Sequence, residues 1–410
     1  LSKEYTIKVK GEFLNVPVDL VMTTDGTGLI AVRQFQKMGA RKVFDPRKVV
    51  LVLDHSVPAP NVEAAETSRV LREFAFQYGT LLYDVGRSGI VHVLLPEQGL
   101  VLPGDGVGGG DSHTCTYGAL GAFATGMGAT DIAFAMAFGQ TWMRVPESIR
   151  LVYHGHLPPW VGGKDLILDT IRRIGVEGAN YKAIEFTGPV IEALTMDERF
   201  TMANMAVEAG AKAGLFPVDE ETLAYVKERA KRPYTAYPPD PDAAYAQTLE
   251  IDVCSLEPQV AFPHSPANAR PVSEAKGIEF EQAVIGSCTN GRLSDLRIAA
   301  RVLAGRRIHP RVRCIVLPGS QEVYLEALGE GLIETFIRAG AAVSTPTCGP
   351  CVGGHMGVLA AGERCISTTN RNFIGRMGSP KSVVYLANPA VVAASAVQGR
   401  IVHPQEVVGR

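Results

Sequence analysis

The chain has 410 residues, of which 46% are hydrophobic and 20% charged, a balance typical of a soluble globular protein with about two to three domains. Lys and Arg number 40 and Asp and Glu 42. The resulting net charge of −2 disfavours a nucleic-acid-binding protein, which usually carries a basic excess. The sequence contains no apolar run of the ~18 residues that a membrane span needs, and its start lacks the apolar core of a secretory signal. With seven cysteines and no export signal, we expect a cytoplasmic protein that uses them as ligands, nucleophiles or core residues.

The first third of the chain has the pattern of an α/β domain. Apolar runs predict strands at 49–53 and 92–95, and apolar residues at helical spacing predict helices at 61–78 and 131–143. In the glycine-rich stretch 104–128, Gly104, Gly106 and Gly109 formally match a dinucleotide-binding fingerprint. We reject that interpretation because no clear helical pattern follows the fingerprint directly. We place domain 1 at residues 1–146.

The middle of the chain alternates the same two patterns. Strands are predicted within residues 149–155 and 183–188, and helices within residues 164–174 and 197–214. A proline-rich connector at 232–244 then has little capacity for regular structure. We therefore place domain 2 at residues 147–247.

The last third, domain 3 at residues 248–410, has the clearest topology. Strands are predicted at 282–286, 312–318 and 341–345, joined by helices at 295–304 and 321–340, the first capped by Ser294 and ended by Gly305. This β-α-β-α-β order predicts a parallel sheet with right-handed crossovers, whose strands share one carboxyl edge where ligands bind. Cys288 follows the first of these strands, and Cys348 and Cys351 follow the third, so the three thiols can meet at that edge.

These three cysteines lie in the segments GSCTNG and TPTCGPCVGG. A lone C-x-x-C is also typical of a redox dithiol or of half a zinc site, but structural zinc sites commonly use two close pairs. The isolated cysteines are Cys115, Cys254, Cys314 and Cys365. One cysteine plus a pair suits a cubane iron–sulfur cluster in which one iron has no thiolate, since clusters for electron transfer usually have four protein ligands. Such an open iron is a Lewis acid that can polarise oxygen and activate water.

Acid–base candidates lie beside predicted strands or glycine-rich loops. The residues concerned are Asp54 with His55, Asp111 with Ser112 and His113, and His92. Glu208 comes four residues after Asn204, so the two are expected on one face of a helix. A carboxylate beside an imidazole can orient the ring and raise its basicity, as proton transfer requires. A lone histidine is more often structural, and no context supports a role for His154, His156, His309 or His403.

Residues 367–380, STTNRNFIGRMGSP, suggest an anion site. Arg371 and Arg376 lie close together there, with Asn370 beside them and little charge-balancing acid. The alternative is a surface loop with solvated arginines. Because arginine forks bind carboxylates bidentately, a di- or tricarboxylate substrate would suit this segment.

Taken in order, the segments GDSHT, NMAVEAGAKAG, GSCTNG, TPTCGPCVGG and NRNFIGRMG resemble motifs of the aconitase superfamily, from about residue 16 to about residue 405. The resemblance is greatest to its two-subunit branch, whose members act on isopropylmalate or homoaconitate. It implies three α/β domains with parallel-rich sheets around a central cleft, which are the superfamily's domains 1–3 without the swivel domain. The sequence departs from the family at Val93, where Gln is common, and at Thr24, where related chains have His; the run 106–110 is also unusually glycine-rich.

The resemblance also implies roles for individual residues. Cys288, Cys348 and Cys351 are expected to hold one [4Fe-4S] cluster per chain. The expected acid–base residues are Asp54, His55, His92, Asp111, His113 and Glu208. The expected substrate-binding residues are Thr24, Ser112, Asn204, Asn370, Arg371 and Arg376.

The activity implied is dehydration and rehydration of a small hydroxy-dicarboxylate. This is 2-isopropylmalate in leucine biosynthesis or, alternatively, homoaconitate in lysine biosynthesis or another malate derivative. Since the chain ends at Arg410 without room for a swivel domain, we expect a heterodimer with a small subunit that carries this domain and a catalytic serine. We expect no nucleic-acid or membrane partner. Alternatives of other classes are an RNA-binding apo-protein, which the near-neutral charge disfavours, and a zinc-bound scaffold.

Overall fold

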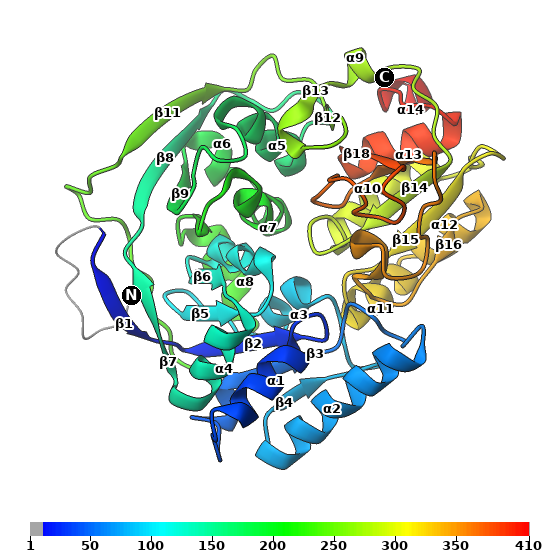
Figure 1. Cartoon of the computed structure of the whole chain (residues 1–410). Coiled ribbons are helices and arrows are strands. Elements are labelled where there is room, and N and C mark those ends of the chain that lie inside the picture. Colours follow the sequence, from blue (N-terminus) through cyan, green and yellow to red (C-terminus); the bar gives the residue numbers. More distant parts are fainter. Residues whose placement is uncertain (1–10, 410) are drawn as a thin grey trace. The chain divides into compact units, whose positions relative to one another are not determined.

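The computed structural model describes residues 11–409, which form two compact units (Figure 1). Unit 1 comprises the described part of Leu1–His154 together with Ala179–Ile251, and unit 2 comprises Gly155–Gly178 together with the described part of Asp252–Arg410. In residues 11–409, no helix combines the length and the apolar character that crossing a membrane requires. The division into three domains stays a prediction.

The first sheet of unit 1 is parallel throughout and has five strands in the order β4-β3-β2-β5-β6 in the described residues. Its strands are β2 (Leu20–Thr24), β3 (Val49–Val52), β4 (Leu81–Tyr83), β5 (Gly106–Gly109) and β6 (Phe123–Gly126). The helices α1 (Gly28–Lys37), α2 (Val62–Tyr78) and α4 (Ala129–Phe138) share one apolar core with Val21, Val49 and Leu51 of these strands. Strands β2 and β3 are buried along their whole length; β3 is a continuous apolar run, and β2 is apolar up to Met22 and ends in two buried threonines.

The second sheet of unit 1 has the order β10-β9-β8-β11, and β8, β9 and β10 are parallel. Its strands are β8 (Glu147–His154), β9 (Lys182–Thr187), β10 (Ala213–Leu215) and β11 (Gln247–Asp252). The other elements of unit 1 are β1 (Phe13–Pro17) paired with β7 (Gln140–Arg144), α3 (Val91–Glu97), α6 (Pro189–Glu192), α7 (Met196–Met205), α8 (Glu220–Lys227), and the 3₁₀ segments η1 (Pro46–Lys48), η2 (Ser112–Leu120) and η3 (Ala206–Ala209). Helix α7 packs against η2, which links this sheet to the glycine-rich segment.

Unit 2 contains a seven-stranded sheet in the order β13-β12-β18-β17-β14-β15-β16, parallel from β18 to β16. Its strands are β12 (Gln259–Ala261), β13 (Ala269–Pro271), β14 (Gln282–Gly286), β15 (Arg313–Leu317), β16 (Ala342–Val343), β17 (Arg364–Ser367) and β18 (Val383–Ala387). Its helices are α5 (Gly163–Ile174), α9 (Val272–Ala275), α10 (Leu293–Leu303), α11 (Gln321–Gly329), α12 (Leu332–Ala339), α13 (Pro389–Gln398) and α14 (Gln405–Val408), with 3₁₀ segments η4 (Pro266–Asn268) and η5 (Gly349–Val352). The parallel β-α-β-α-β order predicted for the last third is confirmed.

Several predicted elements of this fold are wrong in detail. Residues 92–95 belong to helix α3, since a short buried apolar run suits either structure. The helix predicted at 131–143 ends at Gly139, whose left-handed φ of 69° leads into β7. Ser294 lies inside the first turn of α10, which begins after Arg292. The helix predicted at 321–340 is two helices, separated at Gly331 with a φ of 74°.

One buried ion pair anchors α7. The Arg199 side chain is fully buried and its guanidinium donates to both carboxylate oxygens of Asp219 at 2.7 Å. The same group donates to the carbonyls of Leu194 at 3.2 Å and Glu192 at 3.0 Å. These bonds satisfy its donors without water, so the position of α7 depends on this arginine.

Replacing this arginine by a neutral residue should destabilise the fold strongly. We expect Arg199→Met to lower the free energy of unfolding by about 3 kcal/mol, because Asp219 and two carbonyls lose their donors. Urea denaturation followed by circular dichroism measures the change. Arg69→Met, at an exposed ion pair on α2, is the matched control and should cost under about 1 kcal/mol. Equal losses of unfolding free energy in the two variants would contradict the structural role given to Arg199.

Candidate functional site

The acid–base candidates of unit 1 lie at the carboxyl edge of its five-stranded sheet. The strand order reverses between β2 and β5, because the chain adds β3 and β4 on one side of β2 and β5 and β6 on the other. Such a switch point leaves a crevice outside the strand ends. Asp54 and His55 follow β3, and Asp111 follows β5. The fold therefore gathers side chains that are far apart in sequence.

His55 is surrounded by carboxylates. Its Nδ1 lies 2.7 Å from Asp54 Oδ1 and 3.8 Å from Asp25 Oδ1, and its Nε2 lies 3.6 Å from Asp111 Oδ2. Burial opposes the charged ring, but Asp54, Asp111 and Asp25 outweigh it and raise the pKa of His55 to about 10. The pKa of Asp54 is raised above its ordinary value because burial outweighs the opposing effect of His55. His55 is thus held as an imidazolium at neutral pH.

Asp111 joins this group to two further histidines. Its Oδ1 lies 2.7 Å from His92 Nε2 and accepts the backbone N–H of His113 at 2.8 Å. Burial would raise the pKa of Asp111, but hydrogen bonds with His113 and His92 bring it well below the usual value. His113 Nε2 in turn lies 2.9 Å from Glu208 Oε1. The structure therefore brings together all six residues predicted to carry acid–base chemistry.

Asn204 and Glu208 reach the same segment by different elements. Asn204 lies in the last turn of α7 and donates from Nδ2 to Thr116 Oγ1 at 2.8 Å, while Glu208 lies in η3 and contacts His113. The prediction of one continuous helix over 197–214 is wrong, because the chain passes from α7 to η3 and then into β10. Both side chains nevertheless contact η2, Asn204 at Thr116 and Glu208 at His113.

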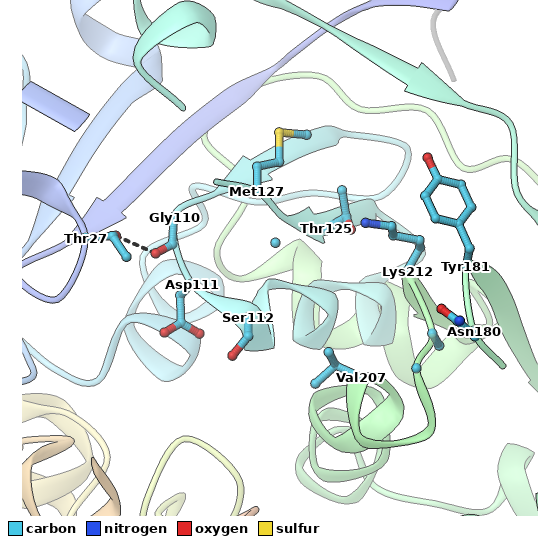
Figure 2. A pocket seen from close by; sticks show the side chains of 13 residues that line it. Thr27, Gly110, Asp111, Ser112, Thr125, Met127, Asn180, Tyr181, Val207 and Lys212 are labelled. Atoms are coloured by element: carbon cyan, nitrogen blue, oxygen red, sulfur yellow. Dashed lines mark hydrogen bonds between the residues drawn. The ribbon is translucent and has the colours of Figure 1, made fainter. Parts of the chain in front are cut away.

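A pocket of about 540 Å³ opens beside Asp111 and Ser112 in unit 1 (Figure 2). Lys212 and Tyr181 line it too, and the Lys212 ammonium lies 4.9 Å from the Tyr181 ring centroid. Thr27 Oγ1 donates to the Gly110 carbonyl at 2.5 Å at another part of the lining. Predicted Thr24 is buried, and its Oγ1 has no hydrogen-bond partner among the described residues.

The three predicted cluster ligands, Cys288, Cys348 and Cys351, belong to unit 2 and are called the thiol set below. They lie at a second switch point. Strand order there reverses between β14 and β17, and Cys288 follows β14 while Asn370 follows β17. The Asn370 amide donates to Cys288 Sγ at 3.2 Å, and its Oδ1 lies 3.5 Å from Cys351 Sγ. Cys348 precedes η5, and its carbonyl accepts the Cys351 N–H at 3.0 Å. One amide therefore joins the thiols of two loops.

Basic side chains accompany these thiols. Arg376 Nη2 lies 3.8 Å from Cys351 Sγ, and Arg292 donates to the Cys288 carbonyl at 3.2 Å. Arg371 lies over the ring of Phe373, with 5.9 Å between its guanidinium carbon and the centroid. Cations near sulfur favour the thiolate, which is the form that binds metals.

The other cysteines have different surroundings. None of the seven forms a disulfide in residues 11–409. Cys314 is buried in β15, and burial raises the pKa of its thiol to about 12. Burial raises the pKa of Cys365 as well, whereas Cys254 is exposed with its Sγ 3.5 Å from His156 Nδ1. Their surroundings differ from the cation-rich thiol set.

Comparison with known proteins shows to which family the chain belongs. The family model described as "Aconitase family (aconitate hydratase)" matches residues 2–399. The chain belongs to the aconitase family. It is 62% identical over 399 residues, 97% of the chain and 95% of the relative, to the 3-isopropylmalate dehydratase large subunit of Moorella thermoacetica. It is 58% identical over 403 residues, with 97% and 93% covered, to the protein of the same name from Aquifex aeolicus.

A solved structure supports the fold. Aconitase X of Thermococcus kodakaraensis in its holo-form superposes with a TM-score of 0.52 at 13% identity, covering 87% of this chain and 84% of that one. At this identity the similarity concerns the fold alone. The predicted α/β aconitase-type fold is confirmed, and family membership implies an iron–sulfur protein.

Sequence analysis of this aconitase-family chain missed Asp25. Its Oδ1 accepts the backbone N–H groups of Asp54 at 2.9 Å and His55 at 2.8 Å, and its Oδ2 accepts that of Ser56 at 2.7 Å. Asp25 follows β2, next to β3, so its carboxylate holds the loop that carries His55. The segment MTTDGTG contained this signal, since an acid directly after a buried strand points to the carboxyl edge.

Removing the Asp25 charge should loosen this arrangement. In Asp25→Asn we expect His55 to titrate about one to three pH units lower, because a carboxylate near its ring becomes neutral. Nuclear magnetic resonance of labelled histidine measures this shift. Asp240→Asn, at an exposed position of the connector, should leave His55 unchanged. An unaltered His55 titration in Asp25→Asn would refute the role given to Asp25.

The raised pKa of His55 also predicts a pH dependence of stability. Protonated His55 stabilises the fold fully below its ordinary pKa of 6.5, and this contribution is lost as pH rises toward about 10. The free energy of unfolding should therefore fall between about pH 7 and 10 in the parent and fall less in His55→Gln. Urea titrations at several pH values compare the slopes. Identical slopes would contradict the charged state assigned to His55.

Proposed function

We propose that this chain is the large subunit of a 3-isopropylmalate dehydratase, a hydro-lyase of leucine biosynthesis. The enzyme interconverts 2-isopropylmalate and 3-isopropylmalate by loss and return of water. The observation that carries this proposal is the 62% identity over 97% of the chain to a large subunit of that name. The residues at the two switch points suit the chemistry that the reaction needs.

The thiol set fits an iron–sulfur cluster. Cys288, Cys348 and Cys351 are buried and form no disulfide. Asn370 lies beside the sulfur atoms of Cys288 and Cys351, and Arg376 lies beside that of Cys351. Soft thiolate ligands in a cation-rich loop cluster are the donor set that iron–sulfur clusters use. We assign these three as ligands of one [4Fe-4S] cluster per chain. When bound, such a cluster supplies a Lewis-acidic iron that polarises the C–O bond of a hydroxy acid.

His55 is the acid that we assign to the leaving hydroxyl. Its pKa of about 10 keeps the ring protonated at neutral pH, so it can give a proton to departing hydroxide. Asp54 fixes the ring through Nδ1, which directs Nε2 toward the carboxyl edge of the sheet. Asp111, ionised by its low pKa, holds the His92 ring through Nε2 and accepts the backbone N–H of His113, which fixes the start of η2. Glu208 orients His113 from its other side.

Substrate recognition is assigned to polar groups contributed by each unit. The residues proposed to contact the hydroxy-dicarboxylate are Thr24, Ser112, Asn204, Asn370, Arg371 and Arg376. Arg371 and Arg376 match its carboxylates in charge and shape. The unpaired Thr24 hydroxyl and the exposed Ser112 beside the pocket can form hydrogen bonds with oxygen atoms of the substrate.

The partner is a small subunit. The large-subunit relatives imply one by name, and we propose that it carries the swivel domain and the serine that removes the carbon-bound proton. Activity then requires both chains. The test is to reconstitute the large subunit anaerobically with iron and sulfide, add the small subunit from the same genome, and follow the consumption of 2-isopropylmalate. Turnover of homoaconitate in place of 2-isopropylmalate would overturn the substrate assignment.

Loss of a single thiol should abolish cluster binding. We expect Cys288→Ser to retain under about one iron per chain after anaerobic reconstitution, against about four in the parent, because serine is a poor ligand for the cluster. Iron and sulfide analysis and the visible absorption spectrum measure this. Cys254→Ser, at an exposed thiol, should keep the full cluster. A complete cluster in Cys288→Ser, or zinc without sulfide in the parent, would exclude this ligand set.

A further inference from the structure

A buried lysine lies behind the thiol set in unit 2. Lys164, near the start of α5, has only 2% of its surface exposed. Its Nζ donates to the carbonyls of Thr368 at 3.0 Å and Thr369 at 2.6 Å. At the beginning of a helix a lysine is commonly a solvated residue, so its burial requires an explanation.

A buried ammonium needs a compensating negative charge. The two neutral carbonyls accept hydrogen bonds from the Lys164 ammonium but do not neutralise its charge. A buried charge without a counter-ion is costly. The adjacent carboxylate of Asp165 accepts from Gly162 N at 2.9 Å, Gln259 N at 2.7 Å and Asn388 Nδ2 at 2.9 Å. Among the described residues, no carboxylate is hydrogen-bonded or ion-paired with the Lys164 ammonium itself. Lys164 therefore has room for a further negative partner.

The thiol set can supply this charge. Burial lowers the pKa of Lys164 to about 8, while Cys351, Asp295 and Cys288 oppose the decrease. Asp295 accepts from Asn290 Nδ2 at 2.9 Å and from Arg292 N at 3.0 Å. A pKa of about 8 leaves the ammonium charged at neutral pH, and it is attracted to two of the proposed ligands.

The two carbonyls connect Lys164 to the same ligands by structure. Thr368 and Thr369 follow β17 and directly precede Asn370, the residue that contacts both Cys288 and Cys351. Thr368 Oγ1 also accepts the Gly286 N–H at 2.9 Å, at the end of β14. Through its two hydrogen bonds, Lys164 therefore holds the segment that carries Asn370. This segment lies at the switch point of the sheet, between β14 and β17.

We propose that Lys164 is the buried counter-ion of the iron–sulfur cluster and the positioning residue for the Thr368–Asn370 segment. This assignment rests on the proposed function, because a cluster with three thiolate ligands carries net negative charge. A positive charge near it stabilises the bound cluster and its reduced form. The apo-protein, by contrast, bears the cost of burying Lys164 with less compensation.

Lys164→Met tests this proposal in the full-length chain. The substitution removes the charge and keeps an unbranched side chain of similar length. We expect the cluster to be lost to a chelator about tenfold faster than in the parent and its reduction potential to become more negative. The apo-variant should melt at the same temperature as the apo-parent or higher, since replacing an uncompensated buried charge by an apolar group is often stabilising. Lys381→Met, at an exposed lysine of unit 2, is the control and should match the parent.

The outcomes separate this assignment from the proposed function. A parent chain that binds no iron and sulfide would overturn both. A parent with a cluster, together with a Lys164→Met variant of the same chelator resistance and reduction potential, would overturn the assignment of Lys164 alone. Should Lys164→Met not fold, Lys164→Gln decides by the same criteria, because its amide keeps a donor toward the carbonyls without the charge.

Discussion

The residue clusters of both units depend on one constraint, that strands of a parallel sheet end at the same edge and leave a crevice where their order reverses. In unit 1 the strand order reverses between β2 and β5, and in unit 2 it reverses between β14 and β17. Asp25 and Asp111 follow the first pair of strands, and Cys288 and Asn370 follow the second. Residues distant in sequence become neighbours in each unit because the backbone ladder fixes where each strand ends.

Electrostatic compensation keeps these edges ordered. In unit 1 the imidazolium of His55 is balanced by carboxylates, and these are held by backbone N–H groups from the loops they order. In unit 2 the sign is reversed, with thiols among lysine and arginine side chains. Buried charges are costly when unpaired, so each edge is stable only when its complete set of partners is present. A substitution at one member therefore affects the protonation or ligand-binding state of the others.

Sequence reasoning located much of this arrangement, for identifiable reasons. The order β14, β15, β16 was predictable because β14 and β15 contain short apolar runs and residues at helical spacing separate the three strands, so Cys288 was correctly expected directly after a strand. The strand predicted at 92–95 is a helix because four apolar residues carry no period. Asp25 and Lys164 were not found, since an acid or a lysine is usually solvated and only tertiary contacts reveal that these two are buried. Motifs thus identify the residues to which we assign chemistry, while the residues that support them resemble ordinary surface positions in the sequence.

The glycine-rich run links packing to chemistry and explains why the loop after β5 tolerates so little change. A Cβ on Gly109 would lie 1.9 Å from Thr114 Oγ1, and one on Gly126 would lie 2.7 Å from the Asp111 carbonyl. Both contacts are far below van der Waals distance, so any side chain there would push the loop away from the end of β5. Asp111 would then lose its distances to His92 and His55, and the low pKa that keeps it ionised depends on the first of these. The absence of a side chain at Gly109 and Gly126 is therefore what allows the carboxylate to reach its histidines.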